Sequence, residues 1–375
     1  MKVLLTATVQ SHICQFHRPL ADILHQHDCE VYVAAKNNLA EKNGLQLDFA
    51  EKVFDVPFAR SPLSPDNLRA YRILKKIIDQ EHFDIIHCNT PMGGVVTRLA
   101  ARDARKRGTK VFYTAHGFHF YQGAPLKNWL VFYPVEKFFA DHFTDKLITI
   151  TGEDYRLASD KFKCPVERIH GVGVDEKRYF PVTAAEKQKL RKQMGFNDTQ
   201  KIILCVGELL PNKNQQMAIG VMAEIVKKCP DALLLLAGNG PGKTDLEDLI
   251  VQRNLQNNVK LLGYVTNLPD YQHIADISIS CSKREGLPLN IVEAMLSGTS
   301  VVATANRGHR ELIADGQNGF MVKYEDVKSM AEKVFQFLFG DSLREQIIVS
   351  AQKSAHLYDY INVKKELDYI YFQGN

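Results

Sequence analysis

Two glutamates stand eight positions apart in segment 282–295, where a short apolar run gives way to a helical pattern. Glu285 falls in the predicted loop, and Glu293 lies about two turns into the helix that follows. The start of a helix offers free N–H groups and the positive end of its dipole, which suit a diphosphate. Carboxylates at these two places can accept hydrogen bonds from hydroxyl groups. The segment therefore fits a ligand with a diphosphate and hydroxyls, although ordinary surface glutamates can also have this spacing.

A lysine follows another apolar run, in segment 206–214. The segment reads VGELLPNKN, so that Gly207 and Glu208 close the run and Lys213 precedes the next helix. The Lys213 ammonium can pair with a phosphate, whereas the ordinary alternative is a solvated surface lysine. Gly238 begins a second turn, GNGPG, but these glycines are weak evidence because a tight turn between strand and helix needs glycine anyway.

Histidines and an asparagine lie at the ends of two apolar runs in the first half. His116 and His119 belong to YTAHGFH, and Asn89 belongs to HCNTPMGG together with Gly93 and Gly94. Because the ordinary pKa of histidine is near neutral, His116 can act toward a ligand in either protonation state. A lone histidine is more often structural, but one that ends a buried strand lies at the edge where ligands bind.

Short apolar runs recur along the chain and predict the strands that position these residues. Each run is rich in Val, Ile and Leu without polar alternation, which is typical of strands buried on both faces of a parallel sheet. In the first half they span residues 3–9, 30–35, 84–88, 110–116 and 146–151. In the second half they span 201–207, 232–238, 258–264, 277–282, 300–305 and 319–323. Helical patterns separate the runs.

The alternation of strand and helix predicts an α/β protein with two doubly wound, Rossmann-like domains. We place the first domain at residues 1–176 and the second at 177–356, with the join where Gly and Pro interrupt the pattern. The segment 357–375 is predicted to be a helix that packs back on the first domain. Since ligands bind at the carboxyl ends of parallel strands, we expect the active site in the cleft between the two halves.

Composition limits the other classes of function. The 375 residues are 45% hydrophobic and 24% charged, as in an ordinary globular protein. The net charge of +4 is too weak for a nucleic-acid interface, and we predict no nucleic-acid partner. The excess lies in the first half, which suits either contact with an anionic membrane surface or an ordinary solvated surface. The N-terminus reads as a first strand and not as a signal peptide, and no apolar run reaches the length of a membrane-spanning helix.

The spacing of the cysteines and histidines does not indicate a metal-binding site. The seven cysteines are scattered and form no CxxC pair, so we predict neither a disulfide framework nor a structural zinc site. This pattern fits a reducing cytoplasm. Nothing in the spacing of His87, His116 and His119 marks them as metal ligands, and we predict no metal site.

Taken together, these motifs resemble glycosyltransferase family 4, whose members have the GT-B fold of two facing Rossmann-like domains. The spacing of Glu285 and Glu293 matches the EX7E pattern of that family, and GELLPNKN and DGQNG resemble two further motifs. The segments AHGFH and NRGHRE are similar to the subgroup associated with capsule and exopolysaccharide synthesis in bacteria. The resemblance covers nearly the whole chain.

The resemblance implies roles for the residues at matching positions. The implied catalytic residues are His116, Glu285 and Lys213. The implied donor-binding residues are Gly207, Glu208, Gly238, Tyr264, Val265, Gly286, Leu287, Pro288, Leu289, Glu293 and Arg307. The implied acceptor-side residues are His12, Asn89, Gly93, Gly94 and His119. No metal and no cofactor are implied, because the chain has no DxD segment and the nucleotide-sugar is a substrate.

Two positions depart from the family pattern. The donor-phosphate loop usually supplies an arginine, but the chain has Glu208 there, which puts a two-cation clamp in doubt. Arg284 and Arg307 are candidates to replace it. The family's Gly-Gly loop after the first strand is also absent, since the chain reads VQSH and ends this stretch at His12.

The function implied is that of a retaining, metal-independent hexosyl- or N-acetylhexosaminyltransferase. Its donor would be a UDP-sugar, and its acceptor a saccharide or lipid-linked saccharide in capsule or exopolysaccharide synthesis. We expect a cytoplasmic protein with a peripheral contact at the inner face of the membrane. Two alternatives stay open: an isomerase similar to UDP-N-acetylglucosamine 2-epimerase, and a non-catalytic nucleotide-sugar sensor, which the Glu208 departure suggests.

Overall fold

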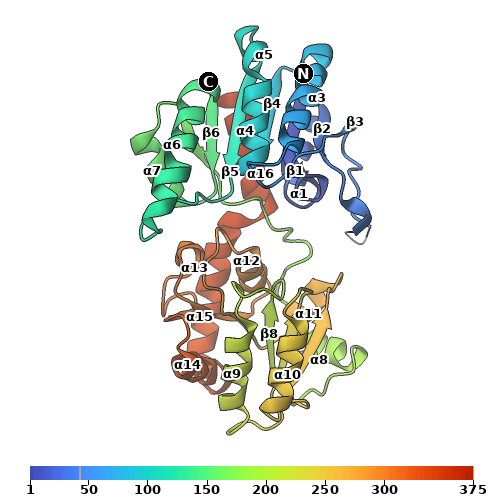
Figure 1. Cartoon of the computed structure of the whole chain (residues 1–375). Coiled ribbons are helices and arrows are strands. Elements are labelled where there is room, and N and C mark those ends of the chain that lie inside the picture. Colours follow the sequence, from blue (N-terminus) through green and yellow to red (C-terminus); the bar gives the residue numbers. More distant parts are fainter. Residues whose placement is uncertain (42–43, 375) are drawn as a thin grey trace. The chain divides into compact units, whose positions relative to one another are not determined.

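The chain folds into two compact units. The computed structural model describes residues 1–41 and 44–374, and its contacts group Met1–Gly173 with Tyr360–Asn375 as unit 1 and Val174–Asp359 as unit 2 (Figure 1). Asn375, the last residue of the predicted C-terminal segment, lies outside the described residues.

Unit 1 is built on a seven-stranded parallel sheet with the order β3-β2-β1-β4-β5-β6-β7. Its strands are β1 (Lys2–Val9), β2 (Glu30–Lys36), β3 (Lys52–Asp55), β4 (Ile85–Asn89), β5 (Lys110–Ala115), β6 (Lys146–Thr149) and β7 (Val166–Arg168). Its helices are α1 (Gln10–Phe16), α2 (Arg18–Gln26), α3 (Asp66–Glu81), α4 (Pro91–Ala100), α5 (Arg102–Lys106), α6 (Leu126–Phe143), α7 (Gly152–Lys161) and α16 (Tyr360–Asp368). A short 3-10 turn spans Leu39–Glu41 and a π turn spans Tyr369–Gln373, whereas the 3-10 turn His356–Tyr358 belongs to unit 2.

Unit 2 is built on a six-stranded parallel sheet with the order β10-β9-β8-β11-β12-β13. Its strands are β8 (Ile202–Val206), β9 (Leu233–Ala237), β10 (Val259–Gly263), β11 (Ile277–Ser280), β12 (Ser300–Thr304) and β13 (Phe320–Val322). Its helices are α8 (Ala184–Gln193), α9 (Gln215–Ile225), α10 (Lys243–Gln252), α11 (Leu268–Ile274), α12 (Leu289–Leu296), α13 (Arg307–Leu312), α14 (Val327–Phe339) and α15 (Asp341–Ala355).

These two doubly wound sheets confirm the predicted α/β fold class. In each sheet the strand order reverses at one place, between β1 and β4 in unit 1 and between β8 and β11 in unit 2. Ligands of such sheets bind beside the carboxyl ends of the strands at this reversal. The fold therefore offers one ligand-binding edge in each unit.

The last segment of the chain packs within unit 1. Helix α16 lies against α2, and the ring of Tyr371 reaches the buried imidazole of His87, whose Nδ1 is 2.5 Å from the tyrosine hydroxyl. His27 Nε2 lies 2.6 Å from the Asp368 carboxylate. In Figure 1 this red segment runs among the blue and green elements of unit 1. Residues far apart in sequence thus form one core.

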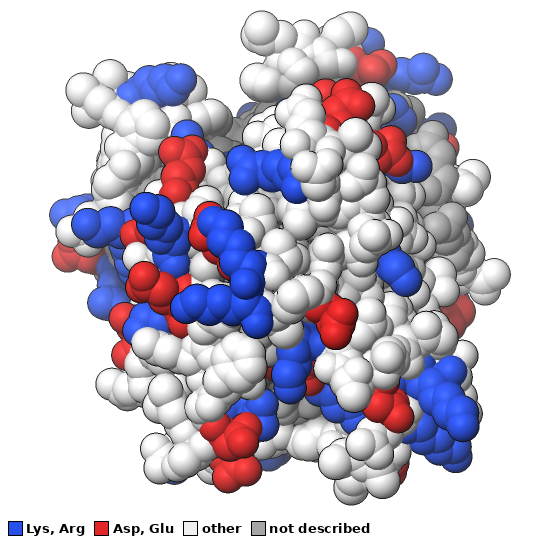
Figure 2. All heavy atoms as spheres, turned by 90° about the horizontal axis from the view of Figure 1, so that it is seen from below, with Lys and Arg blue, Asp and Glu red and all other residues white. Residues whose placement is uncertain are grey.

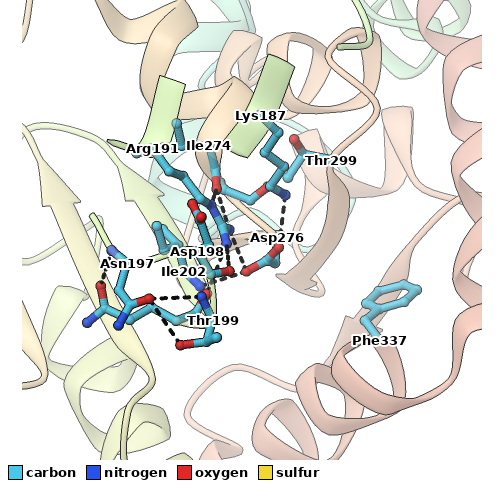
Figure 3. Close-up of polar contacts among 12 residues, drawn as sticks. Lys187, Arg191, Asn197, Asp198, Thr199, Ile202, Ile274, Asp276, Thr299 and Phe337 are labelled. Atoms are coloured by element: carbon cyan, nitrogen blue, oxygen red, sulfur yellow. Dashed lines mark hydrogen bonds and ion pairs between the residues drawn. The ribbon is translucent and has the colours of Figure 1, made fainter. Parts of the chain in front are cut away.

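A buried carboxylate ties α8 to the sheet of unit 2. The helix begins at the capping residue Thr183, which exchanges hydrogen bonds with Glu186. One turn later, Lys187 and Arg191 both contact Asp276 just before β11, each at 2.8 Å (Figure 3). Burial works against the charge of Asp276, but the two cations outweigh it and lower the pKa of that carboxyl. This cluster fixes the element that precedes the second sheet.

The surface carries both signs of charge. On the face that Figure 2 shows, Lys and Arg side chains lie beside Asp and Glu side chains, so that no field of one sign covers this face. Among the described residues, no helix combines the length and the apolar character that are needed to cross a membrane.

Candidate active site

The two backbone turns that follow β8 and β9 in unit 2 pack closely against each other. A Cβ atom at Gly238 would lie 2.0 Å from the carbonyl oxygen of Gly207. Gly238 also has a φ of 150°, a region that L side chains rarely adopt. Glycine is therefore required here by packing, and the turn places Gly238 beside Gly207, at the start of the segment that leads to Lys213.

Lys213 and Glu285 are brought into direct contact at the reversal point between β8 and β11. The Lys213 Nζ donates to Glu285 Oε1 at 2.6 Å, and both side chains are partly buried. Two further bonds join their loops: the Lys283 N–H donates to the Asn212 carbonyl at 2.8 Å, and the Asn212 side chain donates to the Arg284 carbonyl at 2.9 Å. Two residues from separate motifs thus form one paired cation and carboxylate.

Glu293 lies on α12, with its carboxyl group turned to the interior of unit 2. Burial raises the pKa of Glu293 to about 7, although a hydrogen bond from Tyr179 and the charge of Arg178 act in the opposite direction. A carboxyl group with this pKa changes its charge near neutral pH. Its ionisation can therefore be coupled to a ligand that donates hydrogen bonds.

The other residues that the resemblance assigns to the donor all belong to unit 2. Gly308, in α13, packs on the Glu285 loop so closely that a Cβ would lie 2.7 Å from the Glu285 Cβ. Arg307 begins α13, and Tyr264 is 52% exposed after β10. Side chains that are partly buried against the core of unit 2 are Val265, Leu287 and Leu289, and Gly286 and Pro288 lie between Glu285 and α12.

Glu208 is an exposed residue directly after Gly207. Only its backbone is fixed, because the Gln215 side chain donates to the Glu208 carbonyl at 3.0 Å. Its carboxylate has no hydrogen bond or ion pair to the described residues that are placed around it. A second phosphate-binding cation does not come from this position.

In unit 1, three of the predicted residues meet at the reversal point between β1 and β4. The His116 Nε2 lies 3.2 Å from the His12 Nε2 and 3.1 Å from the Asn89 Oδ1. The Asn89 amide nitrogen donates to the Thr6 carbonyl at 3.3 Å, which turns its oxygen toward His116. Burial lowers the pKa of His116 to about 4, so the ring is neutral at physiological pH. A neutral imidazole can accept or donate a hydrogen bond, but it carries no charge for catalysis.

The loop that follows Asn89 is held in an uncommon conformation. Thr90 has φ 64° and ψ 150°, and its hydroxyl contacts the Thr8 hydroxyl at 2.7 Å. Gly93 and Gly94 are buried in α4, where a Cβ would lie 2.6 Å from the Thr90 hydroxyl or from the Tyr113 ring, respectively. These glycines let α4 pack closely on the sheet.

His87 and His119 have structural surroundings. The two ring nitrogens of His87 contact the Tyr371 and Thr114 hydroxyls at 2.5 and 2.7 Å. The ring of His119 stacks on Phe132 with centroids 4.7 Å apart. Among the described residues, the histidines whose ring nitrogens come together are His12, His17 and His116, and not the set of His87, His116 and His119.

A pocket of about 650 Å³ opens beside His12 in unit 1. It is lined by apolar, amide and basic side chains of β1, α1 and the segments after β2 and β3: Thr8, Val9, Ser11, His12, Gln15, Phe16, Lys36, Asn37, Asn38, Phe58, Ala59 and Arg60. Ser11 and Asn38 brace it through a bond of 3.0 Å from the Ser11 N–H to the Asn38 side chain. Lys36 and Arg60 are exposed, and neither forms an ion pair with the described residues.

Sequence reasoning missed four residues of these two sites. His17 lies beside His12 and His116, Tyr179 bonds Glu293, and Lys36 and Arg60 line the pocket. The sequence shows that His12 and His17 are five residues apart. The spacing alone does not predict that they are neighbours, because α1 ends at Phe16, between the two residues. Lys36 is the last residue of β2, and Tyr179 and Arg60 lie in loops; none of the three belongs to a motif.

Comparisons with known proteins identify relatives of both units. The family model described as "Glycosyltransferase Family 4" matches residues 9–175, and the model described as "Glycosyl transferases group 1" matches residues 186–354. The chain is 40% identical over 373 residues to EpsD of Bacillus subtilis strain 168, described as a candidate glycosyltransferase. The match covers 99% of this chain and 96% of that protein.

Two further comparisons are more distant. A UDP-Gal:alpha-D-GlcNAc-diphosphoundecaprenol alpha-1,3-galactosyltransferase of Escherichia coli is 27% identical over 291 residues, which is 76% of this chain and 74% of that enzyme. Among solved structures, HepE of Anabaena in complex with UDP and glucose has a TM-score of 0.78 at 22% identity, covering 98% of both chains. At this identity the structural likeness establishes the GT-B fold alone.

Proposed function

The chain belongs to glycosyltransferase family 4, and from this premise we propose that it transfers a sugar from a UDP-sugar to a lipid-linked saccharide with retention of the anomeric configuration. The observation that carries the proposal is the contact between Lys213 and Glu285 at the ligand-binding edge of unit 2. It sets a phosphate-binding cation beside a hydroxyl-binding carboxylate, which are the two partners that a nucleotide-sugar needs.

On the donor side, Lys213 pairs with the diphosphate, and Glu285 accepts hydrogen bonds from sugar hydroxyls. The unbonded N–H groups at the start of α12 face the same phosphates. Glu293 accepts from the ribose hydroxyls in its ionised form. These groups are held in place before the reaction, so they stabilise the negative charge that develops on the leaving diphosphate.

In the transfer step, the acceptor hydroxyl oxygen forms a bond to the anomeric carbon on the face from which the diphosphate leaves. The bond from the anomeric carbon to the diphosphate oxygen breaks, and the acceptor's proton passes to that oxygen. His116, a neutral ring held by Asn89, positions the reacting sugar and acceptor. Lys213 supplies the charge that other transferases take from a metal at a DxD segment, which this chain lacks.

On the acceptor side, the pocket beside His12 fits a saccharide diphosphate. Lys36 and Arg60 supply two unpaired positive charges, and Asn37, Asn38 and Gln15 supply amides for hydroxyl groups. The Escherichia coli relative is named for an acceptor of this class, a sugar linked through diphosphate to undecaprenol. We take the same class of acceptor for this chain.

Helix α6 is the element that we propose meets the membrane surface. Six of its large apolar side chains are exposed by 42% or more: Leu126, Leu130, Val131, Phe132, Val135 and Phe138. A helix in a globular protein normally buries such side chains, and an exposed apolar group of this size marks an interaction site. A lipid-linked acceptor would reach the pocket from that surface.

The experiment is to incubate the purified chain with single UDP-sugars, with and without a short polyprenyl-diphosphate saccharide. Mass spectrometry follows the acceptor, and a coupled assay follows UDP. We expect acceptor-dependent release of UDP and an acceptor heavier by one sugar. Conversion of the UDP-sugar to an epimer without acceptor would instead identify an isomerase, and binding of UDP-sugar without turnover of any acceptor would identify a sensor.

A further inference from the structure

Three histidines from three segments of unit 1 converge at the carboxyl end of the sheet. His12 belongs to α1, His17 lies between α1 and α2, and His116 directly follows β5. One ring nitrogen of each lies within 4.8 Å of the corresponding nitrogens of the other two. The rings of His12 and His116 are nearly perpendicular, with their Nε2 atoms 3.2 Å apart. The nitrogens therefore point into a common space.

The neighbouring Asn89 assigns the protons in this cluster. Its side-chain oxygen faces His116, because its nitrogen is bonded to the backbone. The His116 Nε2 must then carry the hydrogen and share it between Asn89 and His12. Consequently the His12 Nε2 presents a lone pair toward the cluster.

His17 adds an unsatisfied nitrogen. Its side chain is 4% exposed, and its Nε2 has no hydrogen-bond partner among the described residues. Its ring lies 5.5 Å from that of His12 and 6.0 Å from that of His116. Buried polar atoms are nearly always paired, so one that is left without a partner beside two other ring nitrogens calls for a ligand.

We propose that His12, His17 and His116 bind one transition-metal ion of the zinc class. Three imidazole nitrogens with an open fourth position are a zinc-binding set. Tetrahedral Zn–N bonds of 2.0–2.1 Å place two ligand nitrogens about 3.3 Å apart. His12 and His116 already have this separation, and the third nitrogen, from His17, lies within 4.8 Å of both.

The protonation of the three rings suits this role. Burial lowers the pKa of His17 and of His12 well below the ordinary value, and the neighbouring histidines add to the effect. The rings are therefore neutral at physiological pH, which is the form that binds metal. When the metal binds, the His116 proton moves from Nε2 to Nδ1, so that no proton has to leave the site.

The consequence for activity rests on the proposed function. A metal bound to the His116 Nε2 would take the place of the hydrogen bond to Asn89. The ring could then no longer position the reacting sugar through this nitrogen. The metal is therefore an inhibitor and not a participant in transfer. Chelation should leave the reaction intact and remove the inhibition.

The test is a titration of the purified chain with Co²⁺ and Zn²⁺. We expect one equivalent of Co²⁺ to give the intense visible d–d bands of a tetrahedral site without a thiolate charge-transfer band, since no cysteine is a ligand. Zn²⁺ should displace Co²⁺. His17→Gln should weaken binding by at least about tenfold, because one of three ligands is lost. His142→Gln, which changes a histidine outside the cluster, should bind as the wild type does.

Melting temperature and UDP affinity of His17→Gln show whether the variant is folded, and His12→Asn provides a second ligand deletion if it is not. Absence of tetrahedral bands in the wild type, or unchanged binding in both deletion variants, would overturn the proposal. In the transfer assay, Zn²⁺ should lower the activity of the wild type. The activity of His17→Gln should be the same with and without Zn²⁺. Because the cobalt spectrum does not depend on turnover, a chain that binds metal but transfers no sugar would contradict only the proposed function.

Discussion

Among single residues, Glu293 has the pKa that matters most for binding the donor. Its folded-state pKa of about 7 lies above the ordinary value of 4.5, so the folded chain favours the neutral carboxyl. Ribose hydroxyls donate hydrogen bonds and favour the ionised form. Binding of UDP must therefore release a proton, and the affinity for UDP should rise as the pH increases through about 7.

Glu293→Gln tests this coupling. Calorimetry between pH 6 and 8 with a UDP-sugar, whose diphosphate does not titrate in this range, should show an increase in affinity for the wild type and a flat, roughly tenfold weaker affinity at pH 8 for the variant. The stability effect has the opposite sign. Because the pKa of Glu293 is higher in the folded chain than in the unfolded chain, its contribution to stability is fully present below pH 4.5. This contribution is lost as the pH rises through about 7. The melting temperature of the variant should thus exceed that of the wild type at pH 8. A pH-dependent affinity in the variant would remove Glu293 from the nucleotide site.

His116→Ala should separate chemistry from donor binding. We expect kcat to fall roughly a hundredfold, because a positioning contact made mainly in the transition state is lost. Affinity for UDP, which we place on unit 2, should stay unchanged. A purely structural histidine would behave differently, since its loss would lower the melting temperature and leave the folded fraction active. His119→Ala, which changes a ring stacked on Phe132, is the matched control.

At the level of elements, the strands were predictable wherever both faces are buried. β1, β2, β4, β5, β6 and the six strands of unit 2 follow from continuous apolar runs. The edge strands β3 and β7 were missed because they are short and none of their residues is fully buried, so that they leave no apolar run. The short helices α11 and α13 were missed because they span only seven and six residues.

The site was predictable where one segment carries the chemistry. Glu285 lies in the loop before α12 and Glu293 lies in α12, so their spacing in the sequence was enough to propose them as a pair. The contact between Lys213 and Glu285 depends on β8 and β11 being neighbours, which only the strand order reveals. His17 could not be predicted for the same reason, because its neighbour His116 follows β5, which is far from His17 in the sequence.

Helix α6 gives a prediction about membrane association. Leu130→Asp with Phe138→Asp should reduce binding to vesicles that contain anionic lipid by about tenfold or more, since each buried apolar side chain contributes about 1.5–3 kcal/mol. Sedimentation with vesicles measures the bound fraction. Val251→Asp, at a 57% exposed position on α10 of unit 2, is the control and should bind normally. Equal binding of all three proteins would exclude α6 as the contact.

The Asp276 cluster predicts how α8 contributes to stability. Asp276→Asn leaves Lys187 and Arg191 partly buried without their counter-charge (Figure 3), which should cost about 3–5 kcal/mol. Urea unfolding measures the loss. The exposed Asp248→Asn on α10 should change stability by less than about 0.5 kcal/mol. A similar small effect at Asp276 would show that the cluster is not a stabilising anchor.

In the mechanism that we propose for the whole molecule, Lys213 and helix N–H groups stabilise the negative charge on the leaving diphosphate, and no metal ion is needed. Transfer should therefore persist in excess EDTA, and added Mg²⁺ or Mn²⁺ should not raise it. Lys213→Met should lower kcat/KM by roughly a hundredfold, as expected when an electrostatic donor to the leaving group is lost. Loss of activity on chelation with recovery in Mg²⁺ would contradict this assignment.

Sugar transfer with retention would be visible in the anomeric linkage of the product. The purified chain would be given an α-linked UDP-sugar and a polyprenyl-diphosphate saccharide, and proton NMR of the product would report the new anomeric coupling. The account predicts acceptor-dependent formation of an α linkage. A β linkage would contradict the retaining mechanism, and no product with any UDP-sugar and acceptor of this class would contradict the proposed transfer itself.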